Sequence, residues 1–297
     1  MTINLRRIGS LICAAGMMLS TACGGATSEL PRFARSQSQL DEMNRATAAL
    51  IAPTLMSPGA NTASQEPTGE DAEELMTMSY RIFCSGVFIA DDLVLTAHHC
   101  VDDQHEQGLR IRVGTYQEYI DTQATFSRGR WHYFDIAAVD PGNDLALLRL
   151  SQDEPRNLNR GVMRIAREDP RNGEFVFAMG HPRGLGWTLT YGIVSQATRV
   201  GNAATPGNDD ATIYVQSSAQ AYFGNSGGPL FNTNNQVVGI VSRGGPWHIV
   251  LSIHSSVIRD FVCDSVREDE DCGNYMLSAS RDSNHTRFHM RVAGRVR

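Results

Sequence analysis

The sequence contains no lysine: all 26 of its basic side chains are arginine, in a chain of 297 residues. Acidic residues outnumber basic ones, 32 to 26, and the formal net charge is −6. Such a chain lacks the excess positive charge that attracts a phosphate backbone, which argues against a nucleic-acid partner. No lysine follows the glycine-rich stretch at residues 224–228, so a phosphate-binding loop is disfavoured there as well.

Long hydrophobic runs are also missing. The run at residues 8–19 is about 12 residues long, shorter than the roughly 20 that a membrane-spanning helix needs. Arg6 and Arg7 precede it and small residues follow it up to Ala22, which predicts an export signal over residues 1–22. The stretch ending in Cys23 resembles a bacterial lipoprotein signal. We therefore expect export, with two outcomes open: secretion into the periplasm or medium, or a cell-envelope lipoprotein with Cys23 lipidated and tethered to a membrane.

No long helical period and no internal repeat is present, which disfavours a parallel α/β sheet. Short β-type runs separated by turn residues fill the centre of the chain and indicate β-barrels or a sandwich. The expected strands are residues 82–90, 93–96, 109–113, 144–150, 175–179, 187–197, 213–216, 237–242 and 248–253. A closing helix is expected over residues 255–262.

The flanking segments have a different composition. Residues 23–79 are rich in Ser, Thr, Gln, Pro and Ala, which indicates a linker or propeptide, with one short helix expected over residues 38–51. Residues 263–297 are expected to form a poorly ordered tail.

The six cysteines support export. Cys13 belongs to the signal and Cys23 is the lipidation candidate, which leaves the even set Cys84, Cys100, Cys263 and Cys272. Disulfides persist in oxidising compartments, and four cysteines allow three connectivities, of which 84–100 with 263–272 closes the shortest loops. A zinc site is the weaker alternative, because the spacings are not those of short Cys/His pairs.

Three segments carry the chemistry of an acyl-transfer enzyme. Glycines flank Ser226 on both sides and let the backbone turn sharply around its hydroxyl. A serine needs a neighbouring base, for which His98 and His99 are candidates, and the base needs a carboxylate behind it. Asp144 begins an apolar strand and suits that role, with Asp135 and Asp140 as alternatives.

Together these segments resemble the trypsin/chymotrypsin-like serine peptidases, whose His, Asp and Ser follow in this order. The resemblance rests on Thr-Ala-His-His-Cys, Asp-Leu-Ala-Leu-Leu and Gly-Asn-Ser-Gly-Gly-Pro, with Cys-Ser-Gly preceding them, and covers residues 80–262. It implies an all-β fold of two antiparallel six-stranded β-barrels with a short C-terminal helix. It also implies a catalytic triad and a local disulfide between Cys84 and Cys100. The catalytic roles implied are His99 as base, Asp144 as its orienter, Ser226 as nucleophile, and Gly224 and Ser226 as donors of the oxyanion hole.

Residues 177–186 and 191–195 look similar to the corresponding stretches of HtrA-type peptidases and bacterial glutamyl endopeptidases. Asn225 stands where trypsin-like zymogens keep an Asp, and no Ile-Val-Gly-Gly start precedes Tyr80, so we expect activity without amino-terminal cleavage. Residues 263–297 are too few for the PDZ module usual in the HtrA group.

By the same resemblance, a peptide or protein substrate would add as a strand along residues 241–245. The expected substrate-binding residues are Gln220, Ala221 and Tyr222 at the pocket floor, with Ser242, Arg243 and Gly244 along the strand. No Asp lies at that floor, which argues against a preference for Arg or Lys, and Arg243 is a candidate for attracting an acidic side chain. No cofactor and no metal is expected. Zinc binding by His98, His99 and Cys100, or by His285 and His289 in the loose tail, is the weaker alternative. The sequence thus predicts an exported serine endopeptidase, with a catalytically inactive binding module of the same fold (a pseudoprotease) as the alternative.

Overall fold

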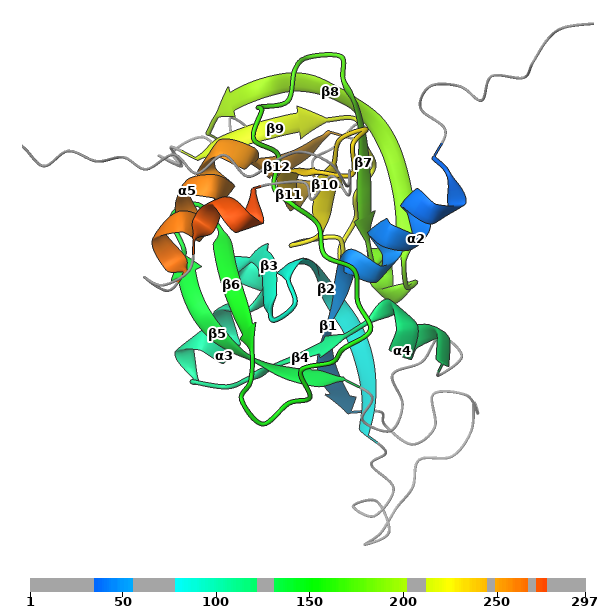
Figure 1. Cartoon of the computed structure of the whole chain (residues 1–297), viewed down its shortest axis with the longest axis vertical. Helices are drawn as coiled ribbons and strands as arrows, with labels where there is room; N and C mark the ends of the chain where they lie inside the picture. Colours follow the sequence, from blue (N-terminus) through cyan, green and yellow to red (C-terminus); the bar gives the residue numbers. More distant parts are fainter. Residues whose placement is uncertain are drawn as a thin grey trace, which may run out of the picture. The chain divides into compact units, whose positions relative to one another are not determined.

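The computed structural model describes residues 35–55, 78–121, 131–201, 212–244, 249–266 and 271–276 (Figure 1). These residues belong almost entirely to one compact unit that begins at Gln37. The expected signal, Cys23 and residues 277–297 lie outside the described residues.

Six antiparallel strands close the first barrel in the order β1-β2-β3-β6-β5-β4. Their bounds are β1 Thr47–Leu55, β2 Met78–Ala90, β3 Leu93–Ala97, β4 Ile111–Gly114, β5 His132–Asp140 and β6 Leu145–Leu150. Alternate side chains of these strands fill the interior, among them Leu50, Phe88 and Phe134, all fully buried. The barrel therefore encloses its own apolar core.

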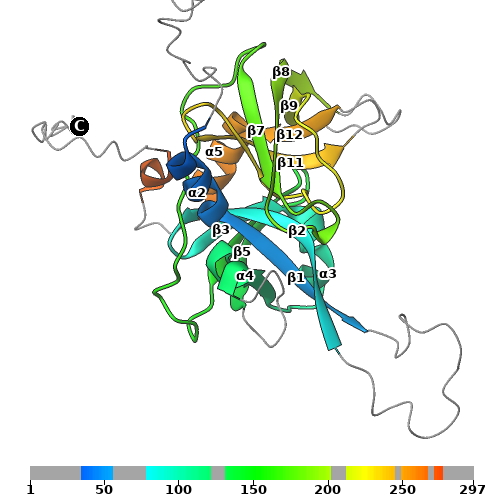
Figure 2. The same cartoon turned by 90° about the vertical axis from the view of Figure 1, so that its right-hand side faces the viewer.

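The second barrel closes in the order β10-β11-β12-β9-β8-β7. Its strands are β7 Phe175–Gly180, β8 Thr188–Val200, β9 Ile213–Ser217, β10 Pro229–Phe231, β11 Val237–Gly244 and β12 Val250–His254. Figure 2 shows β1, β2 and β3 of the first barrel, in blue and cyan, below β7, β8 and β9 of the second, in green to yellow. The expected pair of antiparallel six-stranded barrels is confirmed.

A separate apolar cluster joins the two barrels. It combines Leu95 and Leu147 of the first barrel with Tyr214 and Ile240 of the second, all almost completely buried. Burial of large side chains from both barrels makes the boundary between them part of a continuous core. Segments from opposite ends of the chain are thereby held against each other.

Short helices complete the unit. They are α2 Gln37–Ala46, η2 His98–Cys100, α3 Asp102–Glu106, α4 Tyr116–Asp121, η3 Pro182–Gly184, α5 Ser255–Ser265 and η5 Cys272–Tyr275. The expected closing helix corresponds to α5, whose N-terminus is capped by the His254 side chain accepting from the Ser256 N–H. None of the helices described here is long and apolar enough to cross a membrane.

The amino-terminal boundary differs from the prediction. The helix expected over residues 38–51 ends at Ala46, and the chain continues as β1, inside the range assigned to a linker. β1 pairs with β2 on one edge and with β4 on the other, so it closes the first barrel. The barrel domain therefore begins before residue 80, because those two edges require a strand between them.

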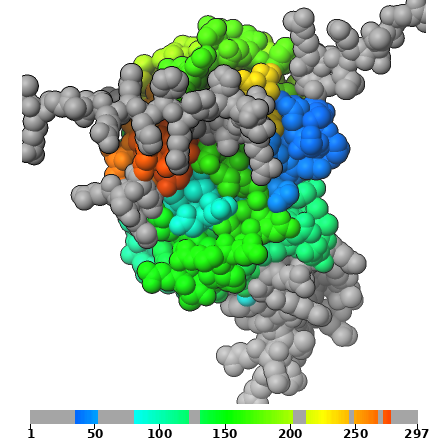
Figure 3. All heavy atoms as spheres, viewed as in Figure 1, coloured from blue at the N-terminus to red at the C-terminus, as the bar shows by residue number. Residues whose placement is uncertain are grey.

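The carboxy-terminal boundary differs too. Tyr275 and Met276 are buried in the cluster between the barrels, and the Ile165 N–H donates to the Tyr275 carbonyl. A disulfide between Cys263 and Cys272 ties this segment to α5. The prediction of a loose tail was therefore wrong for residues 271–276. Figure 3 shows this segment in red and α2 in blue on the same face.

Candidate active site

Strand pairing in the first barrel brings a histidine and an aspartate together. Ala97 at the end of β3 pairs with Leu145 at the start of β6, so the residues just beyond each strand are neighbours. The His98 N–H donates to the Asp144 carbonyl at 3.0 Å, which fixes the turn before β6 against η2. His99 is the next residue and lies within η2.

The Asp144 carboxylate accepts three kinds of donor. They are the His99 backbone N–H at 3.0 Å, the His99 ring at Nδ1, 2.9 Å from Oδ2, and the Ser242 hydroxyl at 2.5 Å. Burial disfavours the charged carboxylate, but the hydrogen bonds from His99 and Ser242 outweigh that cost and lower the pKa of Asp144 below its ordinary value. Asp144 is therefore an ionised carboxylate in contact with the imidazole of His99.

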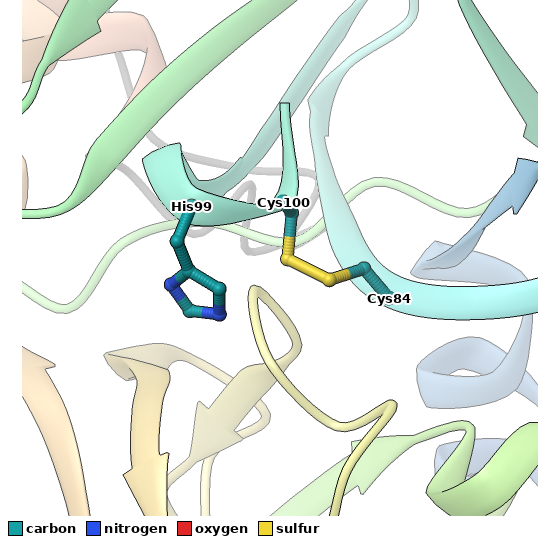
Figure 4. Close-up of side chains that lie close together, drawn as sticks. All are labelled: Cys84, His99 and Cys100. Atoms are coloured by element: carbon teal, nitrogen blue, oxygen red, sulfur yellow. A yellow bond between two sulfur atoms is a disulfide. The ribbon is translucent and has the colours of Figure 1, made fainter. Parts of the chain in front are cut away.

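The same contacts define the tautomer of His99. An ionised carboxylate only accepts hydrogen bonds, so the proton of the neutral ring is assigned to Nδ1 and Nε2 keeps its lone pair. The His99 side chain is 45% exposed, and its ring contacts with described residues are made through Nδ1, not through Nε2. Figure 4 shows the ring projecting from η2, with a loop of the yellow 213–244 region passing beside it and beside the neighbouring disulfide.

The other candidate acids and the second histidine lie elsewhere. Asp140 accepts from the Asn143 side chain at 2.7 Å, and Asp135 is exposed on β5. His98 turns away from the carboxylate of Asp144, with its Nε2 atom 3.6 Å from the Asp102 carboxylate. Of the three acids considered, Asp144 is the one in contact with His99.

The loop carrying Ser226 connects β9 to β10 and lies against the end of β3. A Cβ at Gly227, where φ is +79°, would collide with Thr96 and with the backbone of Ser85 and Ala97, so only glycine allows this approach. The Ser226 carbonyl accepts from the Ser85 N–H at 2.8 Å and lies 3.5 Å from the Cys100 Sγ. Ser226 thus sits beside the residue that follows His99. The hydrogen bonds among described residues do not include one from the Ser226 hydroxyl to His99.

The backbone N–H groups expected to line the oxyanion hole are those of Gly224 and Ser226. Neither donates to any of the described residues. The carbonyls of the same two peptide units are occupied: Phe223 accepts from the Arg183 N–H at 2.6 Å and Asn225 from the Gly228 N–H at 2.9 Å. Because peptides are planar and trans, fixing the carbonyls fixes the N–H directions.

The four cysteines form the pair of disulfides that closes the shortest loops. Cys84 bonds to Cys100 and Cys263 to Cys272, with Cα–Cα distances of 6.0 and 5.0 Å. The atoms of Cys84, His99 and Cys100 that could ligate a metal lie within 4.8 Å of one another (Figure 4). Both sulfurs are consumed by the disulfide, so they are not the thiolates that a zinc ion needs.

The residues expected to bind substrate lie along two facing segments. A Cβ at Gly244 would lie 3.3 Å from the Ala221 carbonyl, so the end of β11 faces the segment before Ser226. Tyr222 is 48% exposed, and the Arg243 guanidinium lies 5.9 Å from the centre of the Tyr214 ring. Gln220 is exposed, and Gly245 lies outside the described residues.

Three polar residues were missed by sequence reasoning. Ser242 was expected along the substrate strand, yet its hydroxyl donates a hydrogen bond to Asp144. Ser85 and His181 are fully buried and bond to each other behind the Ser226 loop. Ser85 stands in the Cys-Ser-Gly motif, and His181 in the stretch that resembles HtrA-type peptidases, but neither pattern indicates that the two side chains meet.

Comparison with known families agrees with this geometry. Residues 84–240, more than half of the chain, match the trypsin-like peptidase domain family. The chain belongs to this family. The match begins at the first cysteine of the disulfide beside His99 and includes His99, Asp144 and Ser226.

Several curated relatives of this trypsin-like peptidase domain are HtrA-type proteases, which confirms the expected subgroup. The chain is 35% identical over 178 residues to "Serine protease HTRA2, mitochondrial" of Bos taurus, covering 59% of this chain and 34% of the relative. It is 34% identical over 183 residues to "Serine protease HTRA1B" of Danio rerio, covering 61% and 34%. A "Probable periplasmic serine endoprotease DegP-like" of Marinomonas is 28% identical over 211 residues, covering 69% and 39%. The chain spans about a third of the length of these relatives.

Proposed function

We propose that this trypsin-like domain is a serine endopeptidase that cleaves peptide bonds through an acyl-enzyme, with Ser226 as nucleophile, His99 as general base and acid, and Asp144 as the orienting carboxylate. The observation that carries the proposal is the contact of both Asp144 oxygens with His99 Nδ1, at 2.9 and 3.0 Å, beside the Ser226 loop. It leaves Nε2 as the acceptor that a serine hydroxyl requires.

The reaction follows from these assignments. The Ser226 hydroxyl attacks the substrate carbonyl and gives its proton to His99 Nε2, and the negative oxygen is stabilised by the N–H groups of Gly224 and Ser226. His99 then protonates the leaving amine, which leaves an acyl group on Ser226. A water molecule, deprotonated by His99, attacks the acyl group, and His99 returns that proton to the Ser226 oxygen as the carboxylic acid leaves. In this scheme Asp144 stays ionised throughout, in agreement with its lowered pKa.

The substrate is proposed to lie as an added strand along Ser242, Arg243 and Gly244, with its side chain directed towards Gln220, Ala221 and Tyr222. Support comes from the close approach of Gly244 to the Ala221 carbonyl. Arg243 would favour an acidic side chain, and a peptide-library profile without enrichment of Asp or Glu would remove this preference.

We further propose that the protein is exported, with residues 1–22 as the signal and Cys23 as a lipidation candidate. One relative is named periplasmic and another mitochondrial, and these descriptions concern those proteins alone. Amino-terminal sequencing and mass determination of the protein from its native host would show the mature terminus and any attached lipid. The same sample tests whether activity requires cleavage within residues 23–79.

One observation favours a second candidate, an inactive binding module of the same fold. Within the described part of the chain, the Ser226 hydroxyl makes no hydrogen bond to His99. Catalytic hydrogen bonds often tighten only when substrate is bound, so this geometry is compatible with both functions. A fluorophosphonate probe separates them: a working nucleophile is labelled in the wild type and not in Ser226→Ala, whereas an inactive module is labelled in neither.

A further inference from the structure

One buried hydroxyl connects the two barrels behind the nucleophile loop. Ser85 lies on β2 of the first barrel, and His181 follows β7 of the second. The Ser85 Oγ atom is 2.8 Å from His181 Nδ1, 3.1 Å from the His181 backbone nitrogen and 2.7 Å from the Gly224 carbonyl oxygen. Both side chains are fully buried, so these contacts exclude water.

The available protons decide the direction of each bond. The Ser85 hydroxyl has one proton, and the Gly224 carbonyl can only accept, so Ser85 donates to Gly224. Ser85 therefore accepts from both the His181 backbone N–H and ring Nδ1, which must carry a proton. Burial lowers the pKa of His181 to about 3, so the ring is neutral and its Nε2 is bare. That Nε2 atom has no hydrogen-bond partner among the described residues.

This hydroxyl acts on the peptide unit that follows Gly224. Gly224 has φ +102°, and a Cβ there would collide with the His181 carbonyl oxygen. The peptide before Gly224 is anchored through the Phe223 carbonyl, and the peptide after it through Ser85. The loop therefore packs on the His181 backbone and is pinned from both sides of Gly224.

The rest of the loop is held by main-chain hydrogen bonds, among them the Gly227 N–H to the Val241 carbonyl at 2.7 Å. The Asn225 side chain is 1% exposed, and neither its amide nitrogen nor its oxygen has a partner in the described part of the chain. Buried polar atoms without partners favour conformations in which they reach water. The observed loop conformation thus depends on these anchors, one of which is the side-chain hydroxyl of Ser85.

We propose that Ser85 and His181 form a positioning pair that holds the Gly224 carbonyl and so keeps the N–H groups of Gly224 and Ser226 aimed at the reacting oxygen. This inference rests on the proposed function, since the aimed N–H groups matter only if an oxyanion forms there. Ser85 and His181 act through the loop and do not touch the substrate.

Three variants test the pair, with one matched control. Ser85→Ala removes the hydroxyl, and His181→Leu removes the ring N–H. His181→Asn is the rescue, because the asparagine amide nitrogen can stand where Nδ1 stands. Ser151→Ala is the control, because Ser151 is also buried and its hydroxyl has no partner among the described residues.

Two measurements are made on the full-length protein. In steady-state hydrolysis corrected by active-site titration, Ser85→Ala and His181→Leu should lower kcat roughly ten-fold or more, because loosely aimed donors approach the loss seen when an oxyanion donor is removed. KM should change less than three-fold, and His181→Asn should recover most of kcat. In hydrogen–deuterium exchange, uptake in peptides covering residues 220–228 should rise several-fold in Ser85→Ala but stay at the wild-type level in Ser151→Ala.

The exchange measurement does not depend on activity, so the two hypotheses fail separately. A wild-type chain that neither cleaves peptides nor reacts with fluorophosphonate overturns the proposed function. Unchanged exchange over residues 220–228 in Ser85→Ala overturns the positioning pair, whatever happens to thermal stability. Equal kcat values for His181→Asn and His181→Leu, both folded, would also overturn it.

Discussion

The two halves of the candidate active site are secured in very different ways. On the histidine side, Asp144 has three donors around its carboxylate, and a disulfide fixes Cys100 beside His99. On the serine side, a glycine-rich loop leaves the Asn225 amide buried without partners, again among the described residues. The base is held by hydrogen bonds to one buried carboxylate, whereas the nucleophile loop is held by main-chain hydrogen bonds and one buried hydroxyl. The two sides should therefore respond differently to mutation.

The largest effect on kcat is expected from a substitution on the histidine side, at Asp144. In Asp144→Asn the amide nitrogen donates and faces His99 Nδ1, which favours the ring tautomer that leaves no lone pair at Nε2. We expect kcat to fall about 10⁴-fold, measured by peptide hydrolysis near neutral pH. Asp140→Asn is the control, because Asp140 bonds to Asn143 and not to His99. A loss of less than ten-fold in Asp144→Asn would show that another group orients the imidazole.

The next effect concerns the serine side. Gly224→Ala places a Cβ against the His181 carbonyl oxygen, at a φ of +102° that side chains rarely adopt. We expect a loss of about 10²-fold or more in kcat, because the loop must move and its N–H groups lose their aim. The matched control is Gly108→Ala, with φ +63° and no atom within 4 Å of the new Cβ.

The control should cost only stability, about 1 kcal/mol in unfolding free energy, because it creates backbone strain without a collision. Equal kcat values in the two glycine variants would mean that the position of the Gly224 backbone does not limit the reaction. In that case the contrast between the two sides of the site would be wrong.

A third prediction tests the disulfide beside His99. Replacing Cys84 and Cys100 together with serine should lower the unfolding free energy by about 3 kcal/mol, because the unfolded chain gains the freedom that a 16-residue closure removed. The Cys263/Cys272 double variant opens a shorter closure of 9 residues and should lose less. Urea denaturation of both variants gives the comparison, and a larger loss at Cys263/Cys272 would contradict it.

Local patterns predicted much of this site. The motifs around His99, Asp144 and Ser226 lie in short continuous segments, and the strand ends that bring His99 to Asp144 are marked by apolar runs on either side. The glycines around Ser226 likewise indicate a local backbone conformation, since Gly224 and Gly227 have positive φ angles. The sequence therefore predicts those parts of the site whose conformation is determined by residues within one short segment.

The features that were missed depend on distant partners. Residues 40, 43, 46, 47, 50 and 51, all apolar except the threonine at 47, have helical spacing. The chain nevertheless changes to β1 at Thr47 because β2 and β4 offer two free edges. β10 is only three residues long and begins at Pro229, the last residue of the Ser226 motif, so it has no periodic pattern of its own. The hydrogen bond from Ser242 to Asp144 joins β11 of the second barrel to the first barrel, and no sequence pattern in either segment predicts it.

The smallest expected effect concerns a saturated cluster of the first barrel, made of His132, Glu118 and Glu154. The His132 ring bridges two carboxylates, with Nε2 at 2.5 Å from Glu118 and Nδ1 at 2.9 Å from Glu154. Burial opposes the charged ring, but the two carboxylates raise its pKa above the ordinary 6.5. Burial likewise opposes the charged Glu118, but hydrogen bonds from His132 and Thr115 lower its pKa below the ordinary 4.5.

The stabilisation from His132 is therefore complete below about pH 6.5 and is lost as the pH rises through the folded-state pKa. The stabilisation from Glu118 is complete above about pH 4.5 and is lost as the pH falls through its own lowered pKa. His132→Gln should lower the thermal midpoint most between about pH 5 and 6.5 and progressively less at higher pH, with kcat unchanged because the cluster does not contact His99 or Ser226. Thermal scans of wild type and variant across pH 4–9 measure this difference. A midpoint difference that grows above pH 7 would mean that a neutral ring makes the stabilising contacts, and a change in kcat would mean that this cluster is coupled to the active site.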